Sequence, residues 1–109
     1  MANVLLNWTA PSDVTNIDGI VVLKKSVTAG AAAPVCSGFI LDDALRSDTA
    51  SDVVTGVTQV GSDITSNLDQ NGSVTETGVD AGSYYYAAFS YNAAGYSPCD
   101  VTDSELVIS

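Results

Sequence analysis

The side chains best suited to chemistry in this sequence are its carboxylates, its two cysteines and one pair of lysines. The chain has 13 acidic residues and no histidine, so the commonest general base and metal ligand of proteins is missing. A serine or cysteine nucleophile would need a lysine as its base, but Lys24 and Lys25 lie in an apolar run typical of a strand. Any two carboxylates could still meet in space, although a small domain without a deep pocket does not favour such a pair. We predict a non-enzymatic protein with no catalytic residues.

Residues 67–78 carry the best partial match to a metal-binding motif. Oxygen-bearing side chains stand at its first, third and fifth positions, glycine at the sixth and an aliphatic residue at the eighth, as in a calcium loop. The twelfth position, which needs a bidentate glutamate, is Gly78. Asn71-Gly72 instead indicates a tight hairpin, and we predict neither a metal nor another cofactor.

Cys36 and Cys99 are the two cysteines of the chain. An even pair permits one disulfide bond, but both residues could equally be small buried hydrophobic side chains. Their separation provides no metal knuckle.

The charge of the chain limits its partners. Three basic residues against 13 acidic ones give a formal charge of −10, which repels nucleic acid phosphates and anionic lipids. We therefore predict no nucleic-acid and no membrane partner.

No apolar run approaches the length of a membrane span, and the start, Met1-Ala2-Asn3-Val4, has neither a basic nor an apolar signal region, so we expect no secretion signal.

The apolar residues come in short runs separated by Ser, Thr, Asn, Asp and Gly, a pattern typical of strands and turns. At 109 residues the chain fits a single domain, residues 1–109. A helical turn is predicted at residues 42–46. Strands are predicted at residues 4–11, 20–25, 35–41, 53–54, 57–60, 73–79, 84–91 and 104–108.

Three stretches, residues 5–11, 17–25 and 77–98, together resemble a fibronectin type III domain of the bacterial and phage kind. The third is the most specific, because Thr77-Gly78-Val79, Gly82, Tyr84-Tyr85-Tyr86 and the run from Asn92 to Pro98 follow the family's strand F and FG turn. The resemblance implies an all-β Greek-key sandwich, with Trp8 on strand B facing strand F. It also implies that Tyr84 is the tyrosine-corner residue at the EF bend.

The chain departs from this family in two places. Strand B begins almost at the N-terminus, so strand A is missing or reduced to residues 1–3, which leaves an edge open to strand complementation or to an oligomer contact. A long insertion, approximately residues 28–72, separates strands C and E. In the family's order Cys36 and Cys99 lie at opposite ends of the sandwich, so their direct pairing would require the insertion to double back.

The resemblance places strands C and F side by side, and side chains alternate along each strand. One set then forms the core: Trp8, Ile20, Val22, Tyr84, Tyr86 and Ala88. The other set forms an apolar outer face: Val21, Leu23, Tyr85, Phe89 and Tyr91. A one-residue error would exchange the sets and still leave an apolar second face. Something should cover this face: the chain's own insertion, another protein subunit for which these five residues are the candidate interface, or a stacked sugar.

These observations predict a structural or binding module that acts through protein contacts. The leading hypothesis is a bacteriophage virion component, either a capsid-decorating or a tail-associated subunit, whose partners are other virion proteins or the host surface. The alternative is an accessory or spacer module of a secreted bacterial enzyme or surface adhesin, located outside the cell and able to bind carbohydrate. Fold alone does not choose between these roles.

Overall fold

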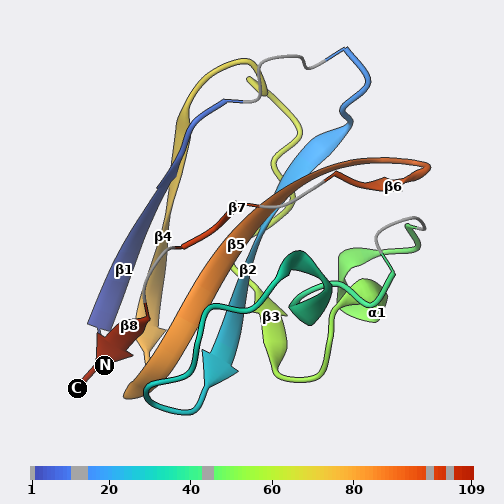
Figure 1. Cartoon of the computed structure of the whole chain (residues 1–109). Coiled ribbons are helices and arrows are strands. Elements are labelled where there is room, and N and C mark those ends of the chain that lie inside the picture. The colour runs from blue at the N-terminus through green and yellow to red at the C-terminus, as the bar shows by residue number, and fades with distance from the viewer. Residues whose placement is uncertain (1, 11–14, 43–45, 98–99, 103–104) are drawn as a thin grey trace.

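Antiparallel strands are the main secondary structure in the computed structural model, which describes residues 2–10, 15–42, 46–97, 100–102 and 105–109 (Figure 1). This confirms the predicted all-β class. The strands are β1 (Ala2–Trp8), β2 (Gly19–Val27), β3 (Val57–Gln59), β4 (Gly72–Val79), β5 (Gly82–Asn92), β6 (Gly95–Tyr96), β7 (Asp100–Val101) and β8 (Leu106–Ile108). Two short helical pieces, η1 (Cys36–Gly38) and α1 (Thr49–Asp52), lie between β2 and β3.

The strands form two sheets. β1 pairs with β4 in a two-stranded sheet, and a larger sheet has the order β3-β2-β5-β6, with β7 and β8 also pairing with β5. The β2–β5 ladder is the longest, running from Gly19 opposite Tyr91 to Val27 opposite Ser83. These two strands carry the densest β-branched and aromatic runs of the sequence, which suit a strand covered on both faces.

Side chains alternate along β2 and β5, and the alternation produces two separate cores. Between the sheets, Val22, Tyr84 and Tyr86 pack against β1 and β4. Ile20 is also buried, Trp8 is half-buried against this core, and Ala88 is half-buried. The second core lies on the other face of the larger sheet.

Tyr84 bonds back across the bend between β4 and β5. Its hydroxyl donates a 2.8 Å hydrogen bond to the backbone carbonyl of Asp80, four residues upstream. Asp80 lies between β4 and β5, so the bond spans the bend at which the chain passes from one sheet to the other.

The insertion differs from its prediction in several places. Residues 35–41 contain the single turn η1 instead of a strand, and the backbone of Ile40 makes only an isolated bridge with Val53. The Asn71-Gly72 hairpin is wrong, because β4 pairs with β1 and not with the strand before it. Residues 57–59 form the predicted strand β3, whereas residues 43–45 of the predicted helical turn lie outside the described residues.

Candidate functional site

The five residues of the candidate interface are buried, so of the three covers expected for this face the structure shows the chain's own insertion. The structure brings these five residues into one core: Val21, Leu23, Tyr85, Phe89 and Tyr91. Phe39, Ile40 and Val57 of the insertion complete this core. The chain's own insertion therefore covers the second face, and Tyr85 and Phe89 do not form a sugar-stacking platform.

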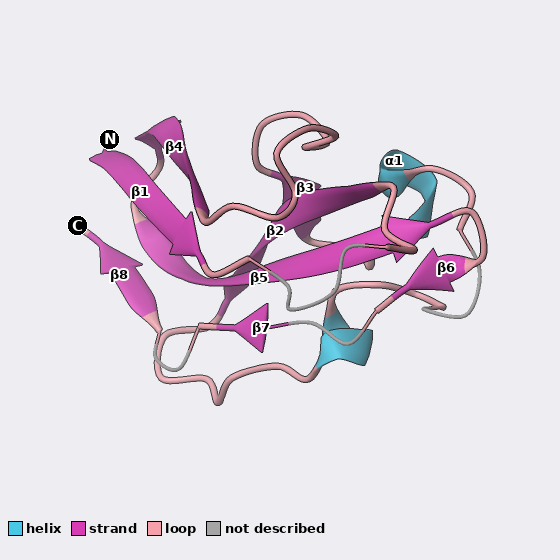
Figure 2. Ribbon diagram, turned by 90° about the horizontal axis from the view of Figure 1, so that it is seen from above, coloured by secondary structure: helices cyan, strands magenta, loops and turns pink. Residues whose placement is uncertain are grey.

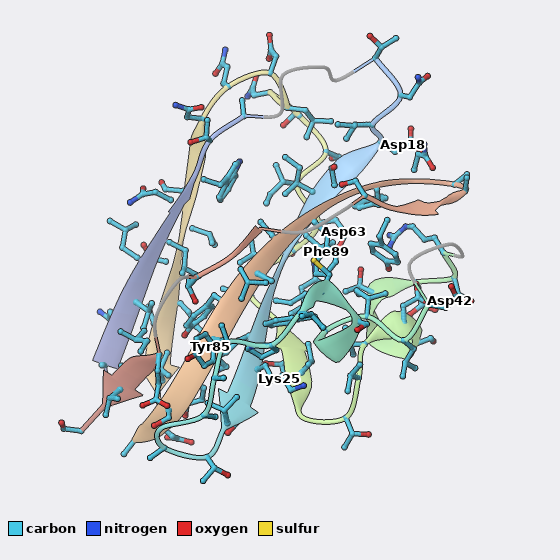
Figure 3. All side chains as sticks on the ribbon, in the orientation of Figure 1. Asp18, Lys25, Asp42, Asp63, Tyr85 and Phe89 are labelled. Carbon is cyan, nitrogen blue, oxygen red and sulfur yellow. The ribbon has the colours of Figure 1, made fainter. Side chains whose placement is uncertain are left out.

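The insertion doubles back along β5. The hydroxyl of Tyr85 donates to the carbonyl of Ala31 at 2.8 Å, and further along the strand the ring of Phe89 meets Phe39 edge-on, with their centroids 6.4 Å apart. Figure 3 shows Tyr85 and Phe89 at successive points along β5. Lys25 ties the same segment to β2 through a 2.7 Å hydrogen bond from its ammonium group to the carbonyl of Gly38.

This path changes the interpretation of the cysteines. Cys36 begins η1, packs against the second core and is disulfide-bonded. The only other cysteine of the sequence is Cys99, which lies outside the described residues. A disulfide between the two cysteines was expected to require the insertion to double back, and the insertion does double back along β5.

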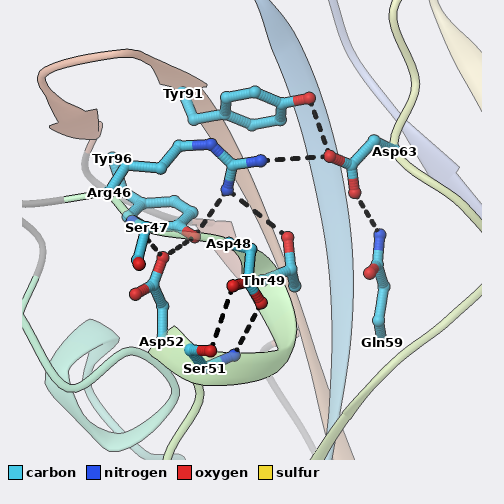
Figure 4. Close-up of polar contacts among 10 residues, drawn as sticks. All are labelled: Arg46, Ser47, Asp48, Thr49, Ser51, Asp52, Gln59, Asp63, Tyr91 and Tyr96. Atoms are coloured by element: carbon cyan, nitrogen blue, oxygen red, sulfur yellow. Dashed lines mark hydrogen bonds and ion pairs between the residues drawn. The ribbon is translucent and has the colours of Figure 1, made fainter.

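Arg46, the only arginine of the chain, holds the far end of the insertion against β5 and β6 (Figure 4). Its guanidinium lies over the ring of Tyr91, 3.7 Å from the centroid. It donates to the hydroxyl of Tyr96 at 2.7 Å and to Asp63 Oδ2 at 3.1 Å. Asp63 also accepts hydrogen bonds from the Tyr91 hydroxyl at 2.9 Å and from the Gln59 amide at 2.6 Å.

The hydroxyl of Tyr96 links this cluster to α1. It donates to Asp52 Oδ2 at 2.7 Å, and the same carboxylate oxygen accepts from the backbone N–H of Ser47 at 3.0 Å. Asp48 caps the N-terminus of α1 by accepting from the backbone N–H of Ser51. A capped single turn is thereby held in a fixed position relative to β6.

The cluster shifts the pKa values of its members in a consistent way. Burial alone would raise the pKa of Asp63, but hydrogen bonds from Gln59 and Tyr91 and the charge of Arg46 lower it below its usual value. Burial, followed by the hydrogen bond to Asp52, raises the pKa of Tyr96 to about 12. Burial and the bond to Asp63 raise the pKa of Tyr91. The carboxylate is thus held ionised and the phenols neutral, which suits a clamp and gives no poised general base.

All three basic side chains are used for internal contacts. Lys24 forms a 3.1 Å ion pair with Glu76 of β4, and Glu76 also accepts from the Tyr86 hydroxyl at 3.0 Å between the two sheets. Lys25 contacts η1, and Arg46 forms the clamp. Sequence reasoning gave these residues no role, because nothing in the sequence places an insertion residue beside a distant strand.

Trp8 borders two hollows in the surface of the molecule. A groove of about 220 Å³ opens between the two sheets beside β1. Its lining is Leu6, Asn7 and Trp8 of β1, Val22 of β2, Tyr86, Ala87 and Ala88 of β5, Val101 of β7, and Thr102. A second hollow of about 460 Å³ lies next to Trp8, beside Thr9, Asn71 and Ser73. Figure 2 shows β1 between β4 and the side of the molecule that carries β7 and β8. The groove of mixed polar and apolar lining beside β1 is the candidate binding site.

Comparisons with family models, with curated proteins and with solved structures find no match to this chain. Among the residues that the structure describes, no group of three or more potential metal ligands comes together. None of the described helices is long and apolar enough to cross a membrane.

Proposed function

We propose that the chain is a non-enzymatic structural and binding module with a fibronectin type III-like fold. The pairing order supports this fold: in the family's lettering β1 and β4 take the places of strands B and E, while β3, β2 and β5 take those of C′, C and F. The Tyr84 hydrogen bond at the bend before β5 is a second feature of such sandwiches. Among the described residues no strand pairs with the second edge of β1, where the family places strand A.

The groove beside β1 carries the functional proposal. A strand A would cover this side of a complete sandwich, and here the apolar side chains of Leu6 and Trp8 line a groove open to solvent. β1 pairs only with β4 within the described part of the chain, so its second edge retains free backbone donors and acceptors. An extended segment from another protein can add to such an edge and place its side chains in the groove.

The role that we favour is that of a virion component, a capsid-decorating or tail-associated subunit bound through this groove. Peptide mass spectrometry of phage particles from a strain that carries the gene should detect the chain. Recombinant protein should rebind to particles lacking it, and Thr102→Arg, which blocks the rim of the groove, should abolish rebinding. Thr58→Arg, at the exposed position of β3, is the matched control. Absence of the chain from particles, or equal rebinding by both variants, would contradict the proposal.

The alternative, a module of a secreted enzyme or surface adhesin, is supported by the disulfide-bonded state of Cys36. Disulfides persist mainly in oxidising compartments, which suits a protein that matures outside the cytoplasm. Fractionation of the source cells distinguishes the two roles. Recovery of the chain in the cell-wall or secreted fraction, as part of a longer polypeptide, would favour this alternative and count against a virion subunit.

A further inference from the structure

The free edge of β1 lacks the features that normally prevent strands from pairing with other molecules. Its sequence, Ala-Asn-Val-Leu-Leu-Asn-Trp, contains no charge and no proline, the commonest protections of edge strands. One irregularity occurs in the β1–β4 ladder: from Ala2–Val79 to Val4–Glu76, β4 advances three residues and β1 advances two. The extra residue therefore belongs to β4, where Gly78 has a φ of 68°, and β1 itself runs without a bulge.

The sheet that contains β1 is also neutral on its outer surface. The exposed residues of β1 and β4 are Asn3, Leu5, Asn7, Ser73, Thr75, Thr77 and Gly78, and Glu76 is turned inward to Lys24 and Tyr86. In a chain with a formal charge of −10, two copies repel each other over most of their surfaces. The outer face and edge of β1 allow a close approach without opposing like charges.

The sequence of β1 is self-complementary about Leu5, and we propose that β1 pairs antiparallel with β1 of a second copy. In this register Leu5 faces Leu5 of the other copy, Val4 faces Leu6, and Asn3 faces Asn7. Ala2 then faces Trp8, so the smallest side chain of the strand lies opposite the largest. Apolar pairs and amide pairs of this kind stabilise antiparallel ladders, and a two-fold contact between identical patches is the commonest form of oligomer.

The pairing of β1 with β1 of a second copy would also fill the groove beside β1. Side chains of the added strand that point inward, Val4 and Leu6, would continue the apolar lining that Leu6 and Trp8 provide in the first copy. The contact joins the two β1–β4 sheets into one four-stranded sheet of order β4-β1-β1-β4. This inference rests on the proposed binding role of the β1 edge and names a second copy of the chain as its occupant in solution, so self-pairing and docking to a particle compete for the same edge.

Light scattering coupled to size-exclusion chromatography tests the proposal, with a mass of twice 11.1 kDa expected over a concentration series. Leu5 is 62% exposed, so Leu5→Lys leaves the cores intact but places two ammonium groups opposite each other, and it should weaken dimerisation by about tenfold or more. Val107→Lys is the matched control, since Val107 is an exposed strand residue of similar accessibility (60%) in β8 and the charge change is identical. An equimolar mixture of Leu5→Lys and Leu5→Glu should restore the dimer.

Cross-linking tests the register independently. Leu5→Cys should form an intermolecular disulfide under mild oxidation, because opposed residues in antiparallel strands have Cβ atoms about 5 Å apart. Asn3→Cys alone should not cross-link, whereas Asn3→Cys mixed with Asn7→Cys should. A chain that stays monomeric at every concentration, or a dimer that Leu5→Lys and Val107→Lys affect equally, would overturn the self-pairing. A monomer that still rebinds to particles through the groove would overturn the self-pairing while leaving the proposed function standing.

Discussion

Replacing Arg46 with methionine keeps most of the side-chain volume at this position but removes the guanidinium that holds the insertion against β5 and β6. The stacking on Tyr91 at 3.7 Å is worth about 0.5–2 kcal/mol. Hydrogen bonds of a charged group are worth about 1.5–3 kcal/mol each when buried, and those to Tyr96 and Asp63 are partly exposed. Asp63 keeps its bonds from Gln59 and Tyr91, which limits the loss. We expect the free energy of unfolding to fall by about 2–4 kcal/mol, a decrease in Tm of about 10–25 °C.

Urea unfolding followed by far-UV circular dichroism and by Trp8 fluorescence measures this change. A double-mutant cycle with Asp63→Asn should give a coupling energy of at least about 0.5 kcal/mol, because the two side chains are in contact. Ser66→Ala, in an exposed loop, is a control that should change stability by less than about 0.5 kcal/mol. If Arg46→Met lowers the free energy of unfolding by less than about 1 kcal/mol, or shows no coupling to Asp63, the Arg46 cluster does not stabilise the packing of the insertion on β5 and β6.

Three further predictions concern stability. Tyr84→Phe removes the hydrogen bond to the Asp80 carbonyl and should lower the free energy of unfolding by about 0.5–1.5 kcal/mol; no change in denaturant midpoint would contradict this. Gly72→Ala adds a methyl group that overlaps the indole of Trp8, so it should cost about 1–3 kcal/mol and shift the tryptophan emission. The raised pKa of Tyr96, from 10.0 to about 12, stabilises the folded chain below pH 10 and loses this effect as pH rises towards 12. Alkaline unfolding should therefore be shallower in Tyr96→Phe than in the parent chain.

The positions of strands could be predicted where a short run of consecutive residues carried the signal. Residues 20–25 and 84–91 are long β-branched and aromatic runs, and both lie within the central ladder of β2 and β5. Their alternation also assigned side chains to the correct faces, because neighbouring residues of a strand must point in opposite directions. The role of Tyr84 at the bend was expected from the family resemblance and not from the residue pattern, and its hydrogen bond joins residues only four positions apart.

The covering of the second face could not be predicted, because it depends on contacts between residues far apart in the sequence. Ala31 meets Tyr85, and Arg46 meets Tyr96. The small residues of 28–34 and the hydroxyl-rich residues 47–67 show no hydrophobic periodicity. The sequence therefore did not indicate over which face of the sheet the insertion passes. Residues 35–41 were apolar enough to suggest a strand. Their side chains instead cover the second core, and this packing requires apolar contacts but no backbone pairing with another strand.

The burial of that face changes where a partner can bind. An aromatic surface left open to water would have provided a large apolar contact, but in this chain Phe39 and Ile40 already fill that position. The free backbone groups of the β1 edge are solvated in the isolated chain, so they do not destabilise it, and a partner strand must displace that water. Pairing at this edge therefore gains little from backbone hydrogen bonds alone. It depends on the groove beside Trp8 and on a neutral partner strand of matching register, which makes side-chain complementarity the source of specificity.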